Sequence, residues 1–302
     1  MVKVIIADAL HPSASSLLTE KGLVVQDLSG NKDQLYSSLK EAQAIIVRSA
    51  TKVNTELLDH APNMKIVGRA GVGLDNIDLD ECKKRGVTVV NSPEGPTKSV
   101  AELVLGNMIA LSRNIPIVDK GTKNGKWPKK IKGQELYGKT AGIIGSGMIG
   151  GLFAQYCIAL GMKVLAYDII KLDHLAAMDG FTYVELDEVL TKADVISLHV
   201  PLLPATKHMI DEEAINKMKK GVLLINAARG GIIDEQALVK GLETEKIGGV
   251  ALDVYENEPV SADHPLFEHE NVIATPHIGA QTIQANIKNA QIVCQKIIEY
   301  FE

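Results

Sequence analysis

Three polar side chains in the second half of the chain, Arg229, Glu258 and His277, are of types that together can bind an acid and move a proton. Arginine presents a forked cation to a carboxylate. Histidine takes up and releases a proton near neutral pH, and a glutamate beside it can orient the imidazole and favour its charged form. Taken singly, each has a plain structural explanation: a surface ion pair, an exposed carboxylate or a turn residue. Their functional meaning therefore depends on the elements around them.

A glycine-rich turn in the middle of the chain is typical of a dinucleotide site. Gly145, Gly147 and Gly150 form a GxGxxG pattern between an expected strand at 141–145 and an expected helix at 151–160. In this setting the first glycine permits a tight turn, the second lets backbone N–H groups approach a pyrophosphate, and the third lets the helix pack closely on the sheet. The helix N-terminus then faces the phosphates.

The residue that ends the next expected strand favours NAD over NADP as the cofactor. The strand at 163–168 ends in Asp168, about twenty residues beyond the glycines, where this fingerprint places an acid. We expect Asp168 to accept hydrogen bonds from the adenosine ribose and to repel a 2′-phosphate. Ile169 and Ile170 follow, with no arginine to hold that phosphate.

The three polar side chains come at or after the ends of expected strands, namely 222–226, 249–253 and 272–275. Ligands of open α/β sheets bind outside the carboxyl ends of the strands. Side chains that are far apart in the sequence can therefore converge there. Beside a dinucleotide site, these three indicate a hydride-transfer centre made of a cation, an acid–base group and a group that orients it.

Short β-branched runs alternate with helical patterns along most of the chain. This alternation is typical of βαβ units and parallel sheets, and runs that are apolar on both faces fit sheets covered on both sides. We therefore expect an α/β protein with two Rossmann-like or flavodoxin-like domains. The expected strands are Val2–Asp8, Ala44–Arg48, Lys65–Arg69, Val87–Asn91, Ala141–Gly145, Lys163–Asp168, Val195–His199, Val222–Asn226, Gly249–Asp253 and Val272–Thr275.

A Pro/Gly turn cluster, NSPEGPT at 91–97, separates the first four expected strands from the later series. We expect an NAD-binding domain at 98–282, inserted into a substrate-binding domain made of 1–97 plus 283–302. The terminal helix carries one apolar stripe, which should pack on a domain surface. The helix expected at 99–113 is apolar nearly all round, which predicts burial between domains or subunits.

Length, charge and cysteine usage exclude several classes of protein. With 302 residues, 46% of them apolar and 23% charged, the chain fits a folded protein of two domains. Acidic residues outnumber basic ones, 37 to 32, whereas a nucleic-acid binder is usually basic. No leader segment or uninterrupted membrane span is recognised, and the three cysteines lie far apart without a CxxC. We therefore expect a cytoplasmic protein with no nucleic-acid, membrane or metal partner.

The first domain offers candidate contacts for a small anionic substrate after two of its strands. Arg48, followed by Ser49, is a residue type that suits a phosphate. Gly71, Val72 and Gly73 lie in a second glycine turn. The backbone N–H groups of this turn either form a small nest for a carboxylate or belong to a plain structural turn.

A lysine-rich stretch at 120–132 contains six lysines, no acid and the only tryptophan, Trp127. In an acidic protein it is either a local positive field that steers an anionic substrate or a solvated basic loop. His199, at the end of another expected strand, is interpreted as a packing or backbone-bonding histidine rather than a catalyst.

Long stretches of the chain resemble the D-isomer-specific 2-hydroxyacid dehydrogenase family. The resemblance covers essentially the whole chain, and its most specific stretches are INAARGGIIDEQAL (225–238), GVALDVYENEP (249–259) and TPHIGAQT (275–282). The other stretches are VRSATKV (47–53), GRAGVGLDNIDL (68–79), SVAELVLGNMIALSRNIP (99–116), NGKW (124–127), GKTAGIIGSGMIG (138–150) and SLHVPLLPAT (197–206).

The resemblance implies roles for individual residues. Arg229, Glu258 and His277 match the family's catalytic set, and Asp253 matches the residue that holds the nicotinamide carboxamide. The implied substrate contacts are Arg48, Ser49, Gly71, Val72, Gly73, Arg229 and His277. The implied NAD contacts are Gly145, Gly147, Met148, Ile149, Gly150, Asp168, Val200, Pro201, Thr206, Ala227, Ala228, Arg229, Asp253, His277, Gly279 and Ala280. Many relatives carry an arginine in place of Met148, so a basic group near the pyrophosphate is missing here.

The resemblance also implies an activity. It is strongest to members that use NAD to oxidise D-3-phosphoglycerate to 3-phosphohydroxypyruvate, the first step of the phosphorylated route to serine. The alternatives are a hydroxypyruvate or glyoxylate reductase of the same family, and an NAD-binding corepressor that recruits partners. Similar enzymes pair through the region 99–113, which predicts a homodimer. Long relatives continue into regulatory domains beyond the position of Glu302, so we expect no feedback inhibition by serine.

Overall fold

The protein folds into two compact α/β units. The computed structural model describes residues 1–302, which divide into one unit of residues 1–99 and 280–302 and a second unit of residues 100–279. The second unit is therefore an insertion into the chain of the first. The sequence places the two divisions at 97 and 282, within three residues of these boundaries.

The first unit is built on a five-stranded parallel sheet in the order β2-β1-β3-β4-β5, which is the flavodoxin-like order. Alternate residues of the central strands enter two different apolar clusters, so both faces of the sheet are covered. The strands are β1 (Lys3–Ile6), β2 (Val24–Asp27), β3 (Ala44–Val47), β4 (Ile66–Arg69) and β5 (Thr88–Asn91).

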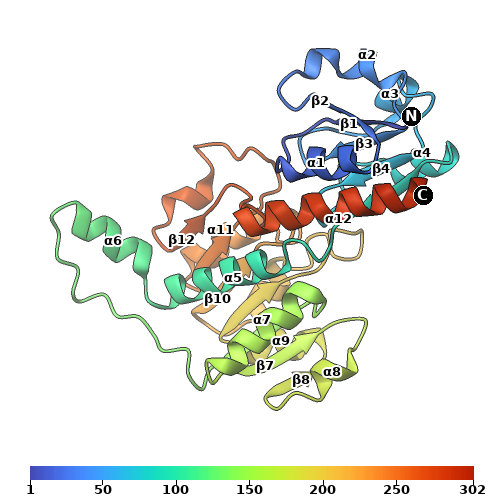
Figure 1. Ribbon diagram of the computed structural model, residues 1–302. Coiled ribbons are helices and arrows are strands. Elements are labelled where there is room, and N and C mark those ends of the chain that lie inside the picture. The colour runs from blue at the N-terminus through green and yellow to red at the C-terminus, as the bar shows by residue number, and fades with distance from the viewer. The chain divides into compact units, whose positions relative to one another are not determined.

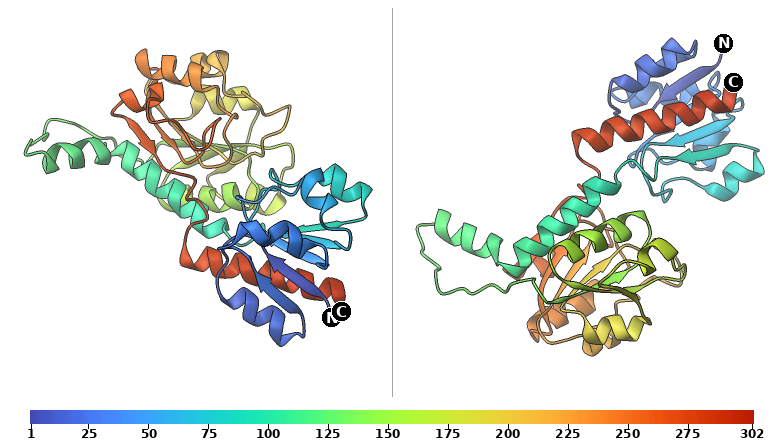
Figure 2. Two further views of the ribbon diagram at one scale, coloured as in Figure 1. Left: turned by 90° about the horizontal axis from the view of Figure 1, so that it is seen from above. Right: turned by 60° about the horizontal axis from the view of Figure 1, so that its bottom comes forward.

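The terminal helix α12 (Ile283–Phe301) packs on this sheet, as its apolar stripe predicted. It lies beside α1 and against β4 and β5 (Figures 1 and 2), and buries Val293 and Ile297. A Cβ on Gly68 would come within 2.6 Å of Val293, so this glycine permits the close approach. The other helices of the unit are α1 (Ser13–Glu20), η1 (Lys32–Gln34), α2 (Leu35–Leu39), α3 (Thr55–Asp59) and α4 (Leu79–Lys84).

The second unit contains a seven-stranded parallel sheet in the order β12-β11-β10-β9-β6-β7-β8. The order reverses between β6 and β9, as in a Rossmann fold, and this switch point is where such sheets bind dinucleotides. The strands are β6 (Thr140–Ile144), β7 (Lys163–Tyr167), β8 (Phe181–Tyr183), β9 (Val195–Leu198), β10 (Val222–Asn226), β11 (Ile247–Leu252) and β12 (Val272–Ala274).

Helices cover both faces of this sheet, and two apolar clusters fill the two layers. Helix α7 begins directly after the glycine turn. Its N-cap residue is Gly147, which has no side chain that could cap the first N–H groups of the helix. The helices are α5 (Thr97–Ser112), α6 (Ile115–Lys123), α7 (Met148–Ala159), α8 (Asp173–Ala176), α9 (Leu186–Lys192), α10 (Glu212–Lys217), α11 (Glu235–Glu243) and η2 (Pro265–Glu268).

Helix α5 is buried along one face and not all round. Val104 and Met108 are fully buried, whereas Glu102, Gly106 and Ile109 are exposed. The burial between domains or subunits that the sequence indicates for this helix therefore stays a prediction. None of the helices has the length and apolar character needed to cross a lipid bilayer.

Helix α6 and the segment after it extend away from the rest of the second unit (Figure 1). No residue of α6 is buried. The lysine-rich stretch begins inside this helix, at Lys120 and Lys123, and continues into the segment that follows. Trp127 is 80% exposed on this segment, as is Tyr137 at its far end.

Candidate active site

The polar side chains of the predicted centre lie at the carboxyl edge of the second sheet, where the carboxyl ends of its parallel strands lie side by side. Arg229, Asp253 and His277 follow the neighbouring strands β10, β11 and β12. All strands of this sheet are parallel, so their carboxyl ends share one edge. The glycine turn after β6 and Asp168 after β7 lie along the same edge. This is the edge at which open α/β sheets bind ligands.

Glu258 and His277 form a direct pair. The Glu258 Oε2 atom lies 2.8 Å from Nδ1 of His277. The other carboxylate oxygen accepts a hydrogen bond from the backbone N–H of Tyr255, 3.1 Å away, which fixes the direction of the glutamate. The His277 backbone has a positive φ of 55°, an uncommon conformation for a residue other than glycine. With Nδ1 engaged by the carboxylate, Nε2 is the nitrogen that can meet a substrate.

Asp253 anchors the turn that carries His277. This aspartate is 1% exposed, and its carboxylate accepts hydrogen bonds from the Thr275 hydroxyl at 2.6 Å and from the N–H groups of Ile278 and Gly279, both at 2.8 Å. A buried carboxylate is stabilised by such donors. Asp253 therefore fixes the backbone on both sides of the histidine.

The turn that carries Arg229 is held by Asn226. The buried Asn226 side chain donates to the carbonyl of Arg229 at 2.9 Å and accepts from the N–H of Ala228 at 3.0 Å. Gly230 follows, and a Cβ at this position would overlap the carbonyl oxygen of Tyr255. Glycine is thus required where the arginine turn passes the segment that leads to Glu258.

A second carboxylate network, which the sequence did not reveal, braces that segment. Glu235, at the start of α11, accepts a hydrogen bond from the N–H of Glu256 at 2.8 Å, and the Glu256 carboxylate accepts from the N–H of Glu235 at 3.3 Å. The second oxygen of Glu235 lies 3.0 Å from Nε2 of His264, and Glu256 lies 3.1 Å from Nε2 of His208. Residues 255–258 are therefore fixed against α11.

The His264 ring orients this network. Its Nδ1 accepts the N–H of Leu266 at 3.3 Å, so Nε2 carries the proton and donates to Glu235. In the sequence, Glu235 can be recognised only as the acid directly after Asp234, the N-cap residue of α11. It does not follow a strand, so a search at the ends of strands does not find it.

The glycine turn has the shape that a pyrophosphate needs. Gly145 has a φ of 93°, and a Cβ there would crowd the backbone of His199. A Cβ on Gly150 would overlap the carbonyl oxygen of Gly145, so the helix can pack this closely only with glycine. Space above Gly147 is open, with no atom within 4 Å of a Cβ position. The residues therefore fit a dinucleotide, with the N–H groups of α7 open for phosphate.

Asp168, directly after β7, is hydrogen-bonded to the glycine turn. Its Oδ2 accepts the N–H of Ser146 at 2.6 Å, and its Oδ1 accepts the N–H of Ile170 at 2.9 Å. Ser146 is fully buried, and its hydroxyl lies 2.9 Å from that of Tyr183. Ile169, the next residue, is 87% exposed. Neither Ile169 nor Ile170 carries a positive charge.

His199 is a packing residue in this structure. Its Nε2 lies 2.9 Å from the Ser197 hydroxyl, and its ring packs 5.7 Å from that of Phe153. Burial of the ring lowers the pKa of His199 to about 4, because the charged imidazolium would lose its hydration. A histidine that stays neutral is suited to support the glycine turn and not to proton transfer at neutral pH.

The remaining predicted cofactor contacts lie around the same edge. Thr206 closes a turn after β9 by donating to the carbonyl of Pro201 at 2.6 Å. Half-exposed Met148 and Ile149 begin α7. The other positions, at the ends of strands or in the His277 turn, are Val200, Ala227, Ala228, Gly279 and Ala280, the last of which begins the returning segment of the first unit.

The predicted substrate residues Arg48, Ser49 and Gly71–Gly73 belong to the first unit. They follow β3 and β4, at the carboxyl edge of that sheet. Gly71 has a φ of 149°, and its N–H already donates to the carbonyl of Arg69 at 2.9 Å. The amides of Val72 and Gly73 donate no such bond.

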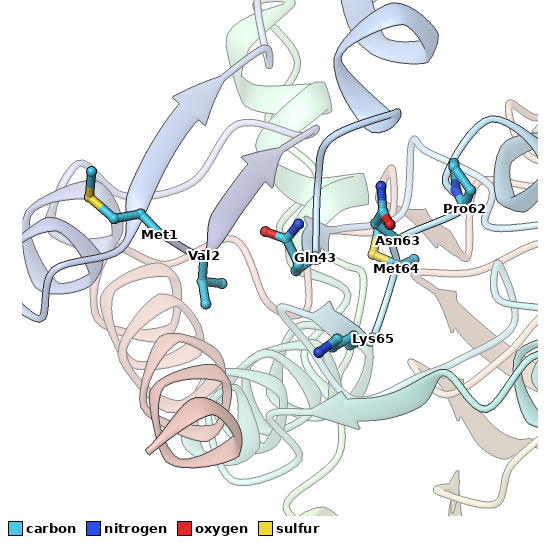
Figure 3. Close-up of a pocket in the computed structure, with 7 residues that line it drawn as sticks. All are labelled: Met1, Val2, Gln43, Pro62, Asn63, Met64 and Lys65. Carbon is cyan, nitrogen blue, oxygen red and sulfur yellow. The ribbon is translucent and has the colours of Figure 1, made fainter.

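A surface pocket in the first unit lies at the opposite edge of its sheet. It is lined by Met1, Val2, Gln43, Pro62, Asn63, Met64 and Lys65 (Figure 3). Its lining precedes β1, β3 and β4, so it marks the amino ends of the strands. Substrate residues are expected at the carboxyl ends, and this pocket is therefore not the candidate site.

The fold and the site together define a class: dinucleotide-binding α/β proteins that carry a Glu–His pair and an arginine at the carboxyl edge of the cofactor sheet. Comparison with known proteins gives the family. Residues 105–279 match the family described as D-isomer specific 2-hydroxyacid dehydrogenase, NAD binding domain. The chain belongs to this family, and its second unit contains the NAD-binding domain.

Relatives with different names are similar over nearly the whole chain. D-3-phosphoglycerate dehydrogenase of Archaeoglobus fulgidus is 44% identical over 98% of this chain, and hydroxypyruvate reductase of Thermotoga maritima is 42% identical over 98%. The chain spans 57% of the length of the former and 97% of the latter. The crystal structure of D-lactate dehydrogenase from Aquifex aeolicus, complexed with NAD and lactic acid, superposes with a TM-score of 0.86 at 34% identity, covering 99% of this chain and 95% of that one.

Proposed function

We propose that this protein oxidises D-3-phosphoglycerate to 3-phosphohydroxypyruvate with NAD, the step that opens the phosphorylated route to serine. The observation that carries the proposal is the Glu258–His277 pair, 2.8 Å apart, on the same sheet edge as the glycine turn. It joins an acid–base group to a dinucleotide site. The name of the A. fulgidus relative supports the choice of substrate.

The second unit would hold NAD through the turn at Gly145–Gly150, the N–H groups that begin α7 and the carboxylate of Asp168. A dinucleotide held there would supply the acceptor for the hydride that leaves C2 of the substrate. Asp253 is already engaged by three donors, so in this proposal its main contribution is to fix the His277 turn. Any contact of Asp253 with the nicotinamide would be additional.

His277 would take the proton of the substrate hydroxyl through Nε2 as the hydride leaves. Glu258 holds Nδ1 and stabilises the imidazolium that forms, because an ionised carboxylate makes a charge-assisted hydrogen bond with it. In the reverse direction the same imidazolium protonates the forming alkoxide. One group thus serves as base and acid, as microscopic reversibility requires.

Substrate anions would be bound by arginines and by backbone amides. In the second unit, Arg229 would hold the C1 carboxylate. In the first unit, the N–H groups of Val72 and Gly73 would offer donors for an anion. Arg48 would bind the phosphate. Its side chain is half-buried and makes no hydrogen bond or ion pair within the protein, so its charge is available for an anion.

A substrate panel tests the proposal. NADH oxidation is followed with 3-phosphohydroxypyruvate, hydroxypyruvate and glyoxylate, and the proposal expects the highest kcat/KM with the phosphorylated acid. A preference for hydroxypyruvate or glyoxylate would make the protein a reductase like the T. maritima relative, whose length it matches. No turnover with any 2-keto acid would favour an NAD-binding scaffold.

We also propose that two copies of the chain pair through the α5–α6 region. The nine-residue helix α6 has no buried residue, and a helix this short gains little stability alone in water. The α5–α6 region and the segment after it carry several exposed apolar side chains: Ile109, Ile115, Trp127, Ile131 and Tyr137. Sedimentation velocity should show a dimer for the parent and a monomer for Trp127→Asp. Tyr300→Asp, on the first unit, should leave the dimer intact.

A further inference from the structure

A buried carboxylate in the first unit holds the loop that carries Arg48. Asp8 follows β1, and Arg48 follows the neighbouring parallel strand β3, so the two residues leave the sheet side by side. Asp8 is 5% exposed. Its Oδ2 accepts the N–H of Arg48 at 2.7 Å and that of Thr51 at 3.1 Å, while its Oδ1 accepts the Thr51 hydroxyl at 2.7 Å.

The opposite side of the same loop is held by Asn76. Its side-chain amide donates to the carbonyl of Arg48 at 2.8 Å and to the carbonyl of Thr51 at 2.6 Å. The backbone of Val53, two residues further on, pairs with that of Ile77 as a parallel bridge. Both N–H and C=O groups at the two ends of the 48–51 loop are thus fixed by side chains from other loops.

A lysine outside the 48–51 loop offsets part of the charge of Asp8. Lys32 lies 3.4 Å from its Oδ1. Burial raises the pKa of Asp8, but the hydrogen bonds from Thr51 and Arg48 and the Lys32 ammonium outweigh burial and lower the pKa overall. Asp8 is therefore ionised at neutral pH, and its oxygens are occupied. It fixes the Arg48 backbone without capturing the Arg48 guanidinium.

A rigid loop that presents an uncommitted cation is suited to bind an anion. Ordering a flexible loop costs conformational entropy at the moment of binding, and that cost is removed when the loop is already fixed. Ser49 and Ala50, at the tip of the loop, are exposed, whereas Thr51 is buried. The loop thus exposes its tip and leaves the Arg48 side chain half-buried and uncommitted.

We propose that Asp8 is a positioning residue for substrate binding, which together with Asn76 holds the 48–51 loop so that Arg48 meets the phosphate of the substrate. This inference rests on the proposed function. Asp8 itself touches neither substrate nor cofactor. Its effect should therefore appear in the KM for the keto acid and should disappear when Arg48 is absent.

The test compares Asp8→Ala with Asp8→Asn by steady-state kinetics with 3-phosphohydroxypyruvate and NADH. Asp8→Ala removes every acceptor, and we expect the KM for the keto acid to rise about ten-fold. Asn keeps one oxygen that can accept both backbone N–H groups, so Asp8→Asn should recover most of the parent KM. The KM for NADH should not change, because the nucleotide turn lies in the other unit.

Two further variants separate positioning from folding. Asn76→Ala frees the loop from the carbonyl side with Asp8 intact, and should raise the same KM even if Asp8→Ala fails to fold. Lys32→Ala removes the ion pair but no contact of the loop, and should leave the KM within about two-fold of the parent.

A double-mutant cycle tests whether Asp8 affects the KM through Arg48. In an Arg48→Ala background, Asp8→Ala should raise the KM for 3-phosphohydroxypyruvate no further, because its effect passes through Arg48. Additive effects, or a parental KM in Asp8→Ala and Asn76→Ala, would overturn the inference alone. A parent without turnover on any 2-keto acid would overturn the proposed function and this inference with it.

Discussion

The carboxylate of Glu258 lies 2.8 Å from Nδ1 of His277, although nineteen residues separate them in the chain. The glutamate is itself directed by the N–H of Tyr255, and the histidine turn is anchored by the buried Asp253. His277 is therefore held by Glu258 at Nδ1 and by Asp253 through its backbone turn, which leaves Nε2 open. In the proposed function, this pair supplies the proton transfer beside the nucleotide-binding sheet.

Glu258→Gln should lower kcat while leaving NADH affinity unchanged. The amide oxygen can keep the hydrogen bond to Nδ1, but the negative charge that stabilises the imidazolium is lost, and we expect a decrease of about a hundred-fold. Steady-state kinetics and NADH fluorescence titration measure the two quantities. Glu268→Gln, an exposed residue of η2, is the matched control and should behave as the parent. An unchanged kcat in Glu258→Gln would remove the glutamate from the mechanism.

Glu235→Ala should reduce kcat by about ten-fold through loss of the brace on residues 255–258. The variant leaves the N–H of Glu256 and Nε2 of His264 without their acceptor. Glu243→Ala, at the exposed end of the same helix, is the control. If the two variants had the same kcat, the brace would have no part in placing Glu258.

Asp168→Ala should weaken discrimination against NADP. Removing the carboxylate removes the repulsion of a 2′-phosphate, so the ratio of kcat/KM for NADH to that for NADPH should fall by about ten-fold. NADH binding should also weaken, because Asp168 holds the N–H of Ser146. Asp179→Ala, an exposed acid in the same unit, should keep the parent ratio. A ratio that stays at the parent value in Asp168→Ala would show that discrimination arises elsewhere.

His199 should make the folded protein less stable as the pH falls. Its folded pKa of about 4 lies below the ordinary value of 6.5, so between these values the unfolded chain binds a proton that the folded chain does not. The free energy of unfolding should decrease by about 2 kcal/mol from pH 7 to pH 5 on account of this residue. Urea unfolding of the parent and of His199→Gln measures it. Equal losses in the two proteins would contradict the assignment.

Much of the fold follows from local sequence pattern, and the exceptions have physical causes. Strands with two covered faces, such as β3 and β10, are predicted because their sequences, AIIV and VLLIN, are continuous apolar runs up to the final Asn226 of β10. The sequence did not predict β2 and β8. Both are the outermost strands of their sheets, where a half-exposed strand needs no apolar pattern. In addition, β8 contains only three residues. Burial of helix α5 between domains or subunits stays a prediction, because composition does not say which face of a helix has a partner.

The candidate site likewise contains features that the sequence predicts and features that it does not. The glycine turn and the polar residues at strand ends could be found because parallel strands bring their carboxyl ends to one edge. The role of Asp253 in anchoring the His277 turn, the Glu235–Glu256 brace and the Asp8 clamp could not. Each depends on hydrogen bonds to backbone N–H groups in another loop, and loop conformation leaves no periodic signal in the sequence.

The central claim is that His277 moves the substrate proton in an NAD-dependent reaction. The most direct measurement is NADH oxidation with 3-phosphohydroxypyruvate by the parent and by His277→Ala, with NADH affinity measured on both and with His60→Ala, an exposed histidine of the first unit, as control. We expect His277→Ala to bind NADH as the parent does but to lose turnover by about a thousand-fold or more. Turnover within a few-fold of the parent would contradict it.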